Sequence, residues 1–384
     1  MTNTIELLQQ LIRFPSVSST SNRSIANEVS NRLEKLGFAV EQTCYVDENQ
    51  VEKVNLVACR HPHSSANPDS SGHAYFCHLD VVPANGWTGP GGDPFDGVLQ
   101  DDRLFGRGSC DMKGSLAAMI QAAESVKESE QLGPLWLVCT ADEEIGFDGA
   151  KHLVNHSEAY REIVNHQPLA IIGEPTELSV VHAHKGIVGL QVISQGRAAH
   201  SSTRDGINAN RAIVPMLQTL LEINEMSETD PAYHDERFDP PILSWNFGVS
   251  DGSTAVNITA ERSVAWVSLR PMPTIDGEDL IERVRERAES LGLEFRRIEG
   301  GAPLWVEPDA ACIQGMCQLA GGEPLTVCYG TDGGEFHELE HRVVFGPGSI
   351  AQAHTTDEWI ALDQLSKGAE MFERILRTDW SHVH

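Results

Sequence analysis

The sequence lacks several features that would assign it to common classes of protein. No two of its eight cysteines are spaced as CxxC, so a zinc ribbon and a thioredoxin-like redox motif are excluded on spacing. It contains no run of about 18 apolar residues, which argues against a helix that spans a membrane. Lys and Arg are scarce, 28 against 56 Asp and Glu, and the net charge of -28 disfavours nucleic acid and anionic membranes as partners.

A targeting segment is also missing from the first residues. The stretch MTNTIELLQQLIRFPS has neither the basic start nor the long apolar core of a signal peptide. Its apolar residues Ile5, Leu8, Leu11 and Ile12 instead predict one face of an amphipathic helix. The cysteines lie scattered, several within apolar runs such as LWLVC, which is typical of a reducing compartment. We therefore expect a cytoplasmic protein.

The length of 384 residues and the order of the expected elements predict two domains of different architecture. Apolar strand-like runs alternate with helical segments from residue 74 to residue 173, which indicates an α/β fold, a doubly wound and mostly parallel sheet. Residues 180–299 instead predict the order βαββαβ, beginning with one long strand over 180–194, and this is a ferredoxin-like unit. We expect an inserted α+β domain at 180–299 within a catalytic domain made of 1–179 and 300–384.

A first group of residues that could bind a metal lies between residues 75 and 119. The apolar run YFCHLD predicts a buried strand that delivers His78 and Asp80 at its carboxyl end. The loop GRGSCD then places Asp111 directly before a predicted helix. Imidazole nitrogen and carboxylate oxygen are ligands for divalent metals. Taken alone, the pattern is equally well explained by an Asp that caps a helix and a His that packs in the core.

Three further clusters follow predicted strands. TADEE provides Glu143 and Glu144 after LWLVC, IIGEPT provides Glu174, and GPGSIAQAHTTDE provides His354. Each cluster alone has an ordinary explanation, since acids often start helices and a lone His is seldom a ligand. The carboxyl ends of parallel strands share one edge of a sheet, so the clusters are expected to meet there.

The combined set predicts a centre with two metal ions. Its members are two imidazoles and three carboxylates, and one carboxylate can bridge two ions about 3.5 Å apart, as in hydrolases that activate water. The proposed ligands are His78, Asp111, Glu144, Glu174 and His354. Glu143 is then free to take a proton from the attacking water, and Asp80 can hold His78 through its other ring nitrogen.

Six stretches, HLDVVP, GRGSCDMKG, TADEEIG, IIGEPT, AAHSS and GPGSIAQAHTTDEW, resemble the motifs of the co-catalytic metal amidohydrolases. This family includes acetylornithine deacetylase, succinyl-diaminopimelate desuccinylase, aminoacylase and the glutamate carboxypeptidases, and the match runs nearly end to end. The resemblance implies that Asp111 bridges two zinc ions, with Glu144 and His354 on one ion and His78 and Glu174 on the other. It also implies that Glu143 is the general base.

The resemblance further implies a homodimer and a substrate site. The family's inserted domain usually dimerises and closes as a lid, and His200 in AAHSS matches the histidine that reaches the neighbouring subunit's active site. Asn257 in AVNIT and Arg270 in LRPMP match positions that bind the substrate's α-carboxylate, a role suited to a planar guanidinium group. Gly330 and Thr331 match a substrate loop. The ligand types do not decide whether the native metal is zinc, cobalt or manganese.

Within the family, EPTELSVVHAHKG, LRPMP and GPGSIAQAHTTDE look most like the acetylornithine deacetylases. The expected reaction is therefore hydrolysis of an N-acyl amino acid, N2-acetyl-L-ornithine, in arginine biosynthesis. Two departures keep the substrate open: Cys77 replaces the usual glycine before the metal histidine, and YGTDGGEF differs from the expected loop. Succinyl-diaminopimelate, acetylcitrulline, other acyl amino acids and dipeptides are the alternatives, together with a metal-bound protein that has no activity.

Overall fold

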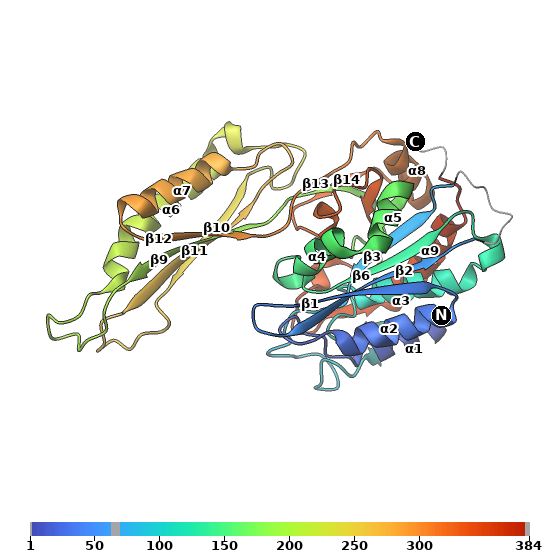
Figure 1. Ribbon diagram of the computed structural model, residues 1–384, viewed down its shortest axis with the longest axis horizontal. Coiled ribbons are helices and arrows are strands. Elements are labelled where there is room, and N and C mark those ends of the chain that lie inside the picture. The colour runs from blue at the N-terminus through green and yellow to red at the C-terminus, as the bar shows by residue number, and fades with distance from the viewer. Residues whose placement is uncertain (1, 63–69, 381–384) are drawn as a thin grey trace. The chain divides into compact units, whose positions relative to one another are not determined.

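The computed structural model describes residues 2–62 and 70–380, which form two compact units (Figure 1). The larger unit contains the described residues up to Ala183, then Trp305–Leu325, and the described residues from Thr331 onward. The smaller unit contains His184–Leu304 and Thr326–Gly330. The domain boundaries inferred from the sequence stay a prediction. In the described ranges, no helix has the length and apolar content needed to cross a bilayer.

A large mixed sheet forms the centre of the larger unit, and its strand order is β1-β2-β6-β3-β7-β15-β8-β13, with β14 paired to β8. The strands are β1 (Ala39–Val46), β2 (Glu52–Arg60), β3 (His73–His78), β6 (Leu135–Thr140), β7 (Leu169–Ile172), β8 (Val181–His184), β13 (Leu304–Trp305), β14 (Leu325–Val327) and β15 (Arg342–Val344). The four strands β6, β3, β7 and β15 are parallel, whereas β1, β2 and β8 join antiparallel. The predicted α/β fold with a parallel centre is confirmed.

Helices cover both faces of this sheet (Figure 1). One face carries α1 (Thr2–Ile12), α2 (Arg23–Lys35), α3 (Lys113–Ser125) and α9 (Leu362–Leu376), and the other carries α4 (Asp148–His156) and α5 (Glu158–His166). The unit also contains α8 (Ala311–Ala320) and a small sheet of β4 (Val98–Gln100), β5 (Arg103–Phe105) and β16 (Trp359–Ala361). Because helices shield both faces, every residue of β3 and β6 is buried, which explains why these strands are almost uninterrupted apolar runs.

The core near the carboxyl ends of β3 and β7 is aromatic. The rings of Phe76 and Phe336 lie 4.4 Å apart, and Tyr75 packs edge-on against Phe372 with 5.5 Å between ring centroids. A Cβ on Gly173 would come within 2.3 Å of the Tyr75 hydroxyl oxygen. Only glycine therefore fits after β7, so the packing of β3 against β7 fixes the chain one residue before Glu174.

The smaller unit has the predicted ferredoxin-like order βαββαβ. Its elements are β9 (Val188–Gln195), α6 (Ala209–Thr229), β10 (Ser244–Ser250), β11 (Arg262–Arg270), α7 (Glu278–Ser290) and β12 (Glu294–Glu299). The strands form an antiparallel sheet in the order β10-β11-β9-β12, and α6 and α7 lie side by side on one face of it (Figure 1). The inserted α+β unit expected from the sequence is confirmed.

The prediction of one long strand over 180–194 was wrong. β8 ends at His184 and β9 begins at Val188, and the two strands belong to different sheets. Between them, the Gly186 N–H donates to the Pro271 carbonyl oxygen and the Ile187 N–H to the Gly301 carbonyl oxygen. These bonds turn the backbone away from a common ladder. The break falls at His184, Lys185 and Gly186, where polar residues and a glycine interrupt the apolar pattern, so the sequence carried a signal that the prediction of one strand passed over.

Candidate active site

The carboxyl ends of three parallel strands meet at one edge of the large sheet. In the β3–β6 pair His78 lies opposite Thr140, and in the β3–β7 pair Phe76 lies opposite Ile172. The Leu79 N–H continues the ladder by donating to the Thr140 carbonyl oxygen at 2.9 Å. Residues that follow these strands by a few positions, Glu143, Glu144 and Glu174, therefore arrive beside His78.

Two loops deliver the remaining residues of the predicted set. Asp111 ends the loop before α3, and His354 follows the glycine-containing loop after β15. His354 has a φ of 63°, in the left-handed region that non-glycine residues seldom adopt. Such backbone conformations concentrate at functional sites, where the surrounding structure holds them in place.

The five side chains form two groups that share Asp111. Asp111 Oδ1 lies 3.1 Å from His78 Nε2, which in turn is 3.9 Å from Glu174 Oε1. Asp111 Oδ2 lies 3.3 Å from His354 Nε2, which is 2.9 Å from Glu144 Oε2. The two oxygens of one carboxylate thus face two different imidazoles.

The donor set fits two divalent metal ions. In each group one ligand atom from every residue lies within 4.8 Å of the others, and all of these atoms are imidazole nitrogens or carboxylate oxygens. Asp111 and Glu174 are almost fully buried, at 7% and 5% exposure. Among the described residues, the buried Glu144 Oε1 atom has no hydrogen-bond partner. Buried carboxylates in such number are stable only beside cations.

The pKa values of these groups show the crowding of negative charge. Burial raises the pKa of Glu143 and of Glu174 well above the usual range, and neighbouring carboxylates raise both further. Burial also acts to raise the pKa of Asp111, but hydrogen bonds from His354 and His78 outweigh it and lower that pKa. Hydrogen bonds to Asp111 and Glu144 raise the pKa of His354 to about 10. The raised pKa of His354 and the lowered pKa of Asp111 both reflect how strongly this carboxylate cluster favours positive charge.

Asp80 contacts the site differently from the contact we predicted. His78 Nδ1 lies 2.9 Å from the backbone carbonyl oxygen of Asp80 and 3.8 Å from its carboxylate Oδ1. The carboxylate instead accepts hydrogen bonds from the backbone N–H groups of Glu143 and Glu144, at 3.2 and 3.4 Å, and from the Ser18 hydroxyl at 2.7 Å. Asp80 thus anchors the turn that carries two acids. The predicted catalytic role of Asp80 stays a prediction.

Glu358 supports the loop of Asp111, a function that sequence reasoning did not assign. Its fully buried carboxylate accepts hydrogen bonds from the backbone N–H groups of Gly108, Cys110 and Asp111 at 2.9–3.0 Å. It also pairs with the Arg107 guanidinium at 2.6 Å. Four donors on one carboxylate fix the conformation of the loop that ends at Asp111.

A second buried network supports the turn of Glu143. Asp142, with a φ of 56°, accepts hydrogen bonds from Lys53 Nζ at 2.6 Å and from the Tyr45 hydroxyl at 2.7 Å. On the other side of Thr140, the buried Asp332 accepts a hydrogen bond from the Thr140 hydroxyl. Burial raises the pKa of Asp332 to about 7. Neither network had a signal in the sequence, because each joins residues far apart in the chain.

The predicted substrate residues are divided between the two units. His200 and Asn257 lie on adjacent exposed segments of the smaller unit, joined by a bridge between His200 and Ile258 and by a 3.0 Å hydrogen bond from the Ser201 N–H to the Asn257 carbonyl oxygen. Arg270, half-buried, ends β11.

The predicted substrate loop crosses the boundary between the units. Gly330 belongs to the smaller unit, whereas Thr331 belongs to the larger one. The buried Thr331 hydroxyl caps a short turn by accepting from the Gly333 N–H at 3.0 Å. Their roles toward substrate, like those of His200, Asn257 and Arg270, stay predictions.

Residues 74–378 match the model of peptidase family M20/M25/M40. The match covers most of the chain, so the protein belongs to this family and is a hydrolase of amide bonds. The resemblance stated from the motifs is confirmed at this level.

Two relatives and one solved structure describe the similarity further. The chain is 33% identical to acetylornithine deacetylase of Myxococcus xanthus, over 93% of this chain and 92% of the relative. It is 30% identical to acetylornithine deacetylase of Proteus mirabilis, over 97% and 95%. The Bacillus subtilis YXEP protein, described as a dinuclear metal binding peptidase, has the same fold with a TM-score of 0.64 at 15% identity, over 98% of this chain and 97% of that one.

Proposed function

We propose that the protein hydrolyses N2-acetyl-L-ornithine to L-ornithine and acetate with the help of two divalent metal ions. The observation that carries this proposal is the pair of ligand groups sharing Asp111, with the acid Glu143 beside them. The substrate assignment is supported by the relatives from Myxococcus xanthus and Proteus mirabilis, which are acetylornithine deacetylases of matching length. Release of ornithine would serve arginine biosynthesis in the cytoplasm.

The metal ions would be held by His78, Glu174 and Asp111 on one side and by Asp111, Glu144 and His354 on the other. Nitrogen and oxygen donors of this kind suit zinc, and they also accept cobalt. When bound, the pair supplies a Lewis acid for the amide oxygen and lowers the pKa of water. The Bacillus subtilis relative described as dinuclear supports this assignment.

Glu143 is the proposed general base. It takes a proton from the attacking water and returns it to the nitrogen of the leaving amine, so the same carboxylate acts as base and then as acid. Two features support this role. The Glu143 N–H is held by Asp80 at 3.2 Å, and the residue is not among the five predicted ligands, so its carboxylate is available for proton transfer.

The smaller unit is proposed to provide substrate contacts and a dimer interface. Arg270 and Asn257 would hold the α-carboxylate, and Gly330, together with Thr331 of the larger unit, would line the acyl site. In a homodimer formed through the smaller unit, the partner subunit's His200 would donate a hydrogen bond to the amide oxygen as negative charge develops there. The adjacent segments of His200 and Asn257 support a shared role for these two residues.

The net charge favours ornithine over acylated diacids. With 56 acidic and 28 basic residues, the protein attracts a substrate whose side chain carries an ammonium group. N-Succinyl-diaminopimelate carries an additional carboxylate on its acyl group and would need more cationic groups around it. This comparison disfavours the desuccinylase activity.

The test is amine release from four substrates by the zinc- or cobalt-loaded protein. N-Acetylornithine, N-acetylcitrulline, N-acetylmethionine and N-succinyl-diaminopimelate are compared at equal concentration, with an EDTA-treated sample as control. We expect kcat/KM for N-acetylornithine to exceed the others by at least about tenfold, a difference of about 1.4 kcal/mol in transition-state binding. Activity that resists EDTA would overturn the metal mechanism. Preference for another member of the panel would overturn the substrate assignment alone.

A further inference from the structure

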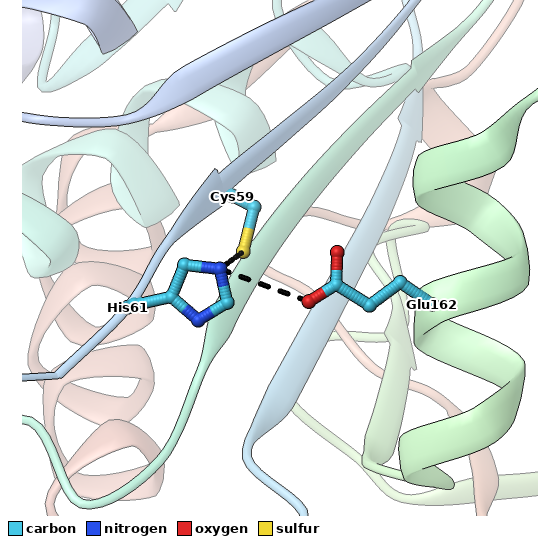
Figure 2. Close-up of side chains that lie close together, drawn as sticks. All are labelled: Cys59, His61 and Glu162. Atoms are coloured by element: carbon cyan, nitrogen blue, oxygen red, sulfur yellow. Dashed lines mark hydrogen bonds and ion pairs between the residues drawn. The ribbon is translucent and has the colours of Figure 1, made fainter.

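A third cluster of possible metal ligands lies outside the site described above. Cys59 is the penultimate residue of β2, His61 follows the strand, and Glu162 lies on α5. Figure 2 shows the three side chains turned toward one another, with one ring nitrogen of His61 joined by dashed lines to the Cys59 sulfur and to a Glu162 oxygen. None of the three belongs to the groups around Asp111.

The alternation of side chains along β2 explains why these residues meet. Asn55 points toward the α4 side, where its side-chain N–H donates to the Gly149 carbonyl oxygen at 2.9 Å. Arg60 points the opposite way and bonds the Ala123 carbonyl oxygen at the end of α3. Because successive residues of a strand alternate, Cys59 lies on the same face as Asn55, the face covered by α4 and α5.

Packing that needs no metal places Glu162 beside the end of β2. His166, one helical turn after Glu162, packs edge-on against Trp136 with 5.1 Å between ring centroids. Trp136 lies directly opposite Cys59 in the β2–β6 ladder. On the same helix Ile163 is fully buried, so α5 has a fixed position over the sheet. The three ligand atoms are thus brought together in advance of any ion.

The distances match those around a tetrahedral zinc ion. Cys59 Sγ lies 3.5 Å from His61 Nε2, and that nitrogen lies 3.7 Å from Glu162 Oε1. Bonds of about 2.3 Å to sulfur and about 2.0–2.1 Å to nitrogen and oxygen, at tetrahedral angles, separate sulfur from nitrogen by about 3.5 Å and nitrogen from oxygen by about 3.4 Å. All three atoms lie within 4.8 Å of one another, so one ion can reach them with small movements.

We propose that Cys59, His61 and Glu162 bind a third divalent ion of the zinc class, with water at the fourth position. Thiolate, imidazole and carboxylate together favour zinc or cobalt over calcium or magnesium, which prefer oxygen alone. Binding forms a metal–sulfur bond and releases one proton from the Cys59 thiol to solvent. The ion joins the end of β2 to α5, so it adds to the stability of the larger unit without entering the amide hydrolysis.

Burial, together with the nearby Glu162 charge, raises the pKa of the Cys59 thiol to about 12. The thiol therefore carries a proton at neutral pH, and a bound ion must displace that proton.

Cobalt is the probe that separates this site from the centre at Asp111. A thiolate bound to Co²⁺ gives an intense near-ultraviolet charge-transfer band, whereas imidazole and carboxylate ligands do not. Protein freed of metal with a chelator is titrated with Co²⁺ and then with Zn²⁺. We expect the band to appear and to saturate within the three equivalents that fill this site and the two ions at Asp111, and to disappear when Zn²⁺ replaces cobalt.

Variants of the cluster and a matched control complete the test. Cys59→Ser should abolish the band and lower the metal content by one ion per chain, whereas Cys44→Ser, which changes an exposed cysteine, should leave both unchanged. His61→Gln and Glu162→Gln change side chains at the surface and should weaken cobalt binding by at least about tenfold, because even the loss of an outer partner of a ligand has about that effect.

Two results would overturn the proposal. One is a band that persists in Cys59→Ser, which would assign it to another cysteine. The other is the absence of any band in native protein that binds cobalt elsewhere, which would leave the three residues as a hydrogen-bonded chain of thiol, imidazole and carboxylate. Amide hydrolysis by Cys59→Ser, measured in parallel, keeps this test independent of the proposed function.

Discussion

The two units differ in how far they bury the residues proposed for metal binding and for substrate binding. In the larger unit, His78 and Asp111 are 2% and 7% exposed, and backbone hydrogen bonds fix the loops that carry the acids. In the smaller unit, His200 and Asn257 are exposed on loop segments. This contrast in exposure corresponds to the two roles proposed for these residues, metal binding in the larger unit and substrate binding in the smaller one. Most of the groups proposed to hold ions have a fixed, buried arrangement, with His354 as the exposed exception, whereas His200 and Asn257 are reachable from solvent.

This division predicts that changes in the larger unit lower turnover, whereas changes in the smaller unit alter substrate binding. The expected effects decrease in the order Asp111, Glu143, Glu358 and Arg270. Each can be compared with a control residue of the same type at an exposed position.

The largest effect is expected for Asp111→Asn, because one carboxylate serves both ligand groups. We expect both ions to be lost and kcat to fall by more than the roughly 10²–10³-fold that removal of a single oxyanion-stabilising donor causes. Elemental analysis and turnover of N-acetylornithine measure the two results. Asp309→Asn, at an exposed position of the same unit, is the control. Retention of the full native metal content in Asp111→Asn would contradict its bridging role.

Glu143→Gln should lower kcat by about 10²–10⁴-fold, the contribution of a well-placed general base. Its metal content should stay at the native value, because Glu143 is not a predicted ligand. The exposed Glu158→Gln serves as control. Turnover close to that of the native protein would remove Glu143 as the base, and loss of metal would show that it acts as a ligand.

Glu358→Gln should destabilise the larger unit by about 3–5 kcal/mol, because it leaves the buried Arg107 guanidinium without its charged partner. Its exposed neighbour offers a matched control, since Asp357→Asn should change the free energy of unfolding by no more than about 0.5 kcal/mol. Denaturant unfolding of both variants measures the difference. Equal free energies of unfolding for the two variants would show that the four hydrogen bonds to Glu358 contribute little to the stability of the larger unit.

The smallest effect is expected in the smaller unit. Arg270→Lys keeps the charge but loses the guanidinium fork, so KM for N-acetylornithine should rise about tenfold with little change in kcat. Arg262→Lys, at the other end of the same strand, should leave both constants unchanged. A loss of kcat as large as that of Glu143→Gln would break the proposed division between the two units.

The sequence was most informative where strands end. An apolar run followed by a His or an acid led to His78, Glu144 and Glu174 as candidate ligands, and parallel pairing brings these positions to one edge of the sheet. The order βαββαβ of the smaller unit was equally visible, because each strand and helix has its own periodicity. Strand ends and the order of helices and strands depend on residues that are close in the chain, so they can be predicted from the sequence.

Contacts between distant parts of the chain could not be predicted in the same way. Glu358 and Asp357 are adjacent acids with the same appearance in the sequence, yet only Glu358 is buried among N–H groups some 250 positions away. The anchoring of Glu143 by the Asp80 carboxylate depends likewise on how two loops pack. The cluster of Cys59, His61 and Glu162 has no motif, because a helix provides its third member.

The central claim is that the two ligand groups sharing Asp111 hold two metal ions. Anomalous diffraction at the zinc edge from crystals of the zinc-loaded protein tests it most directly. The account predicts two peaks about 3.5 Å apart, one on each side of the Asp111 carboxylate. A single peak at Asp111, or none there in crystals whose protein contains zinc by elemental analysis, would contradict it.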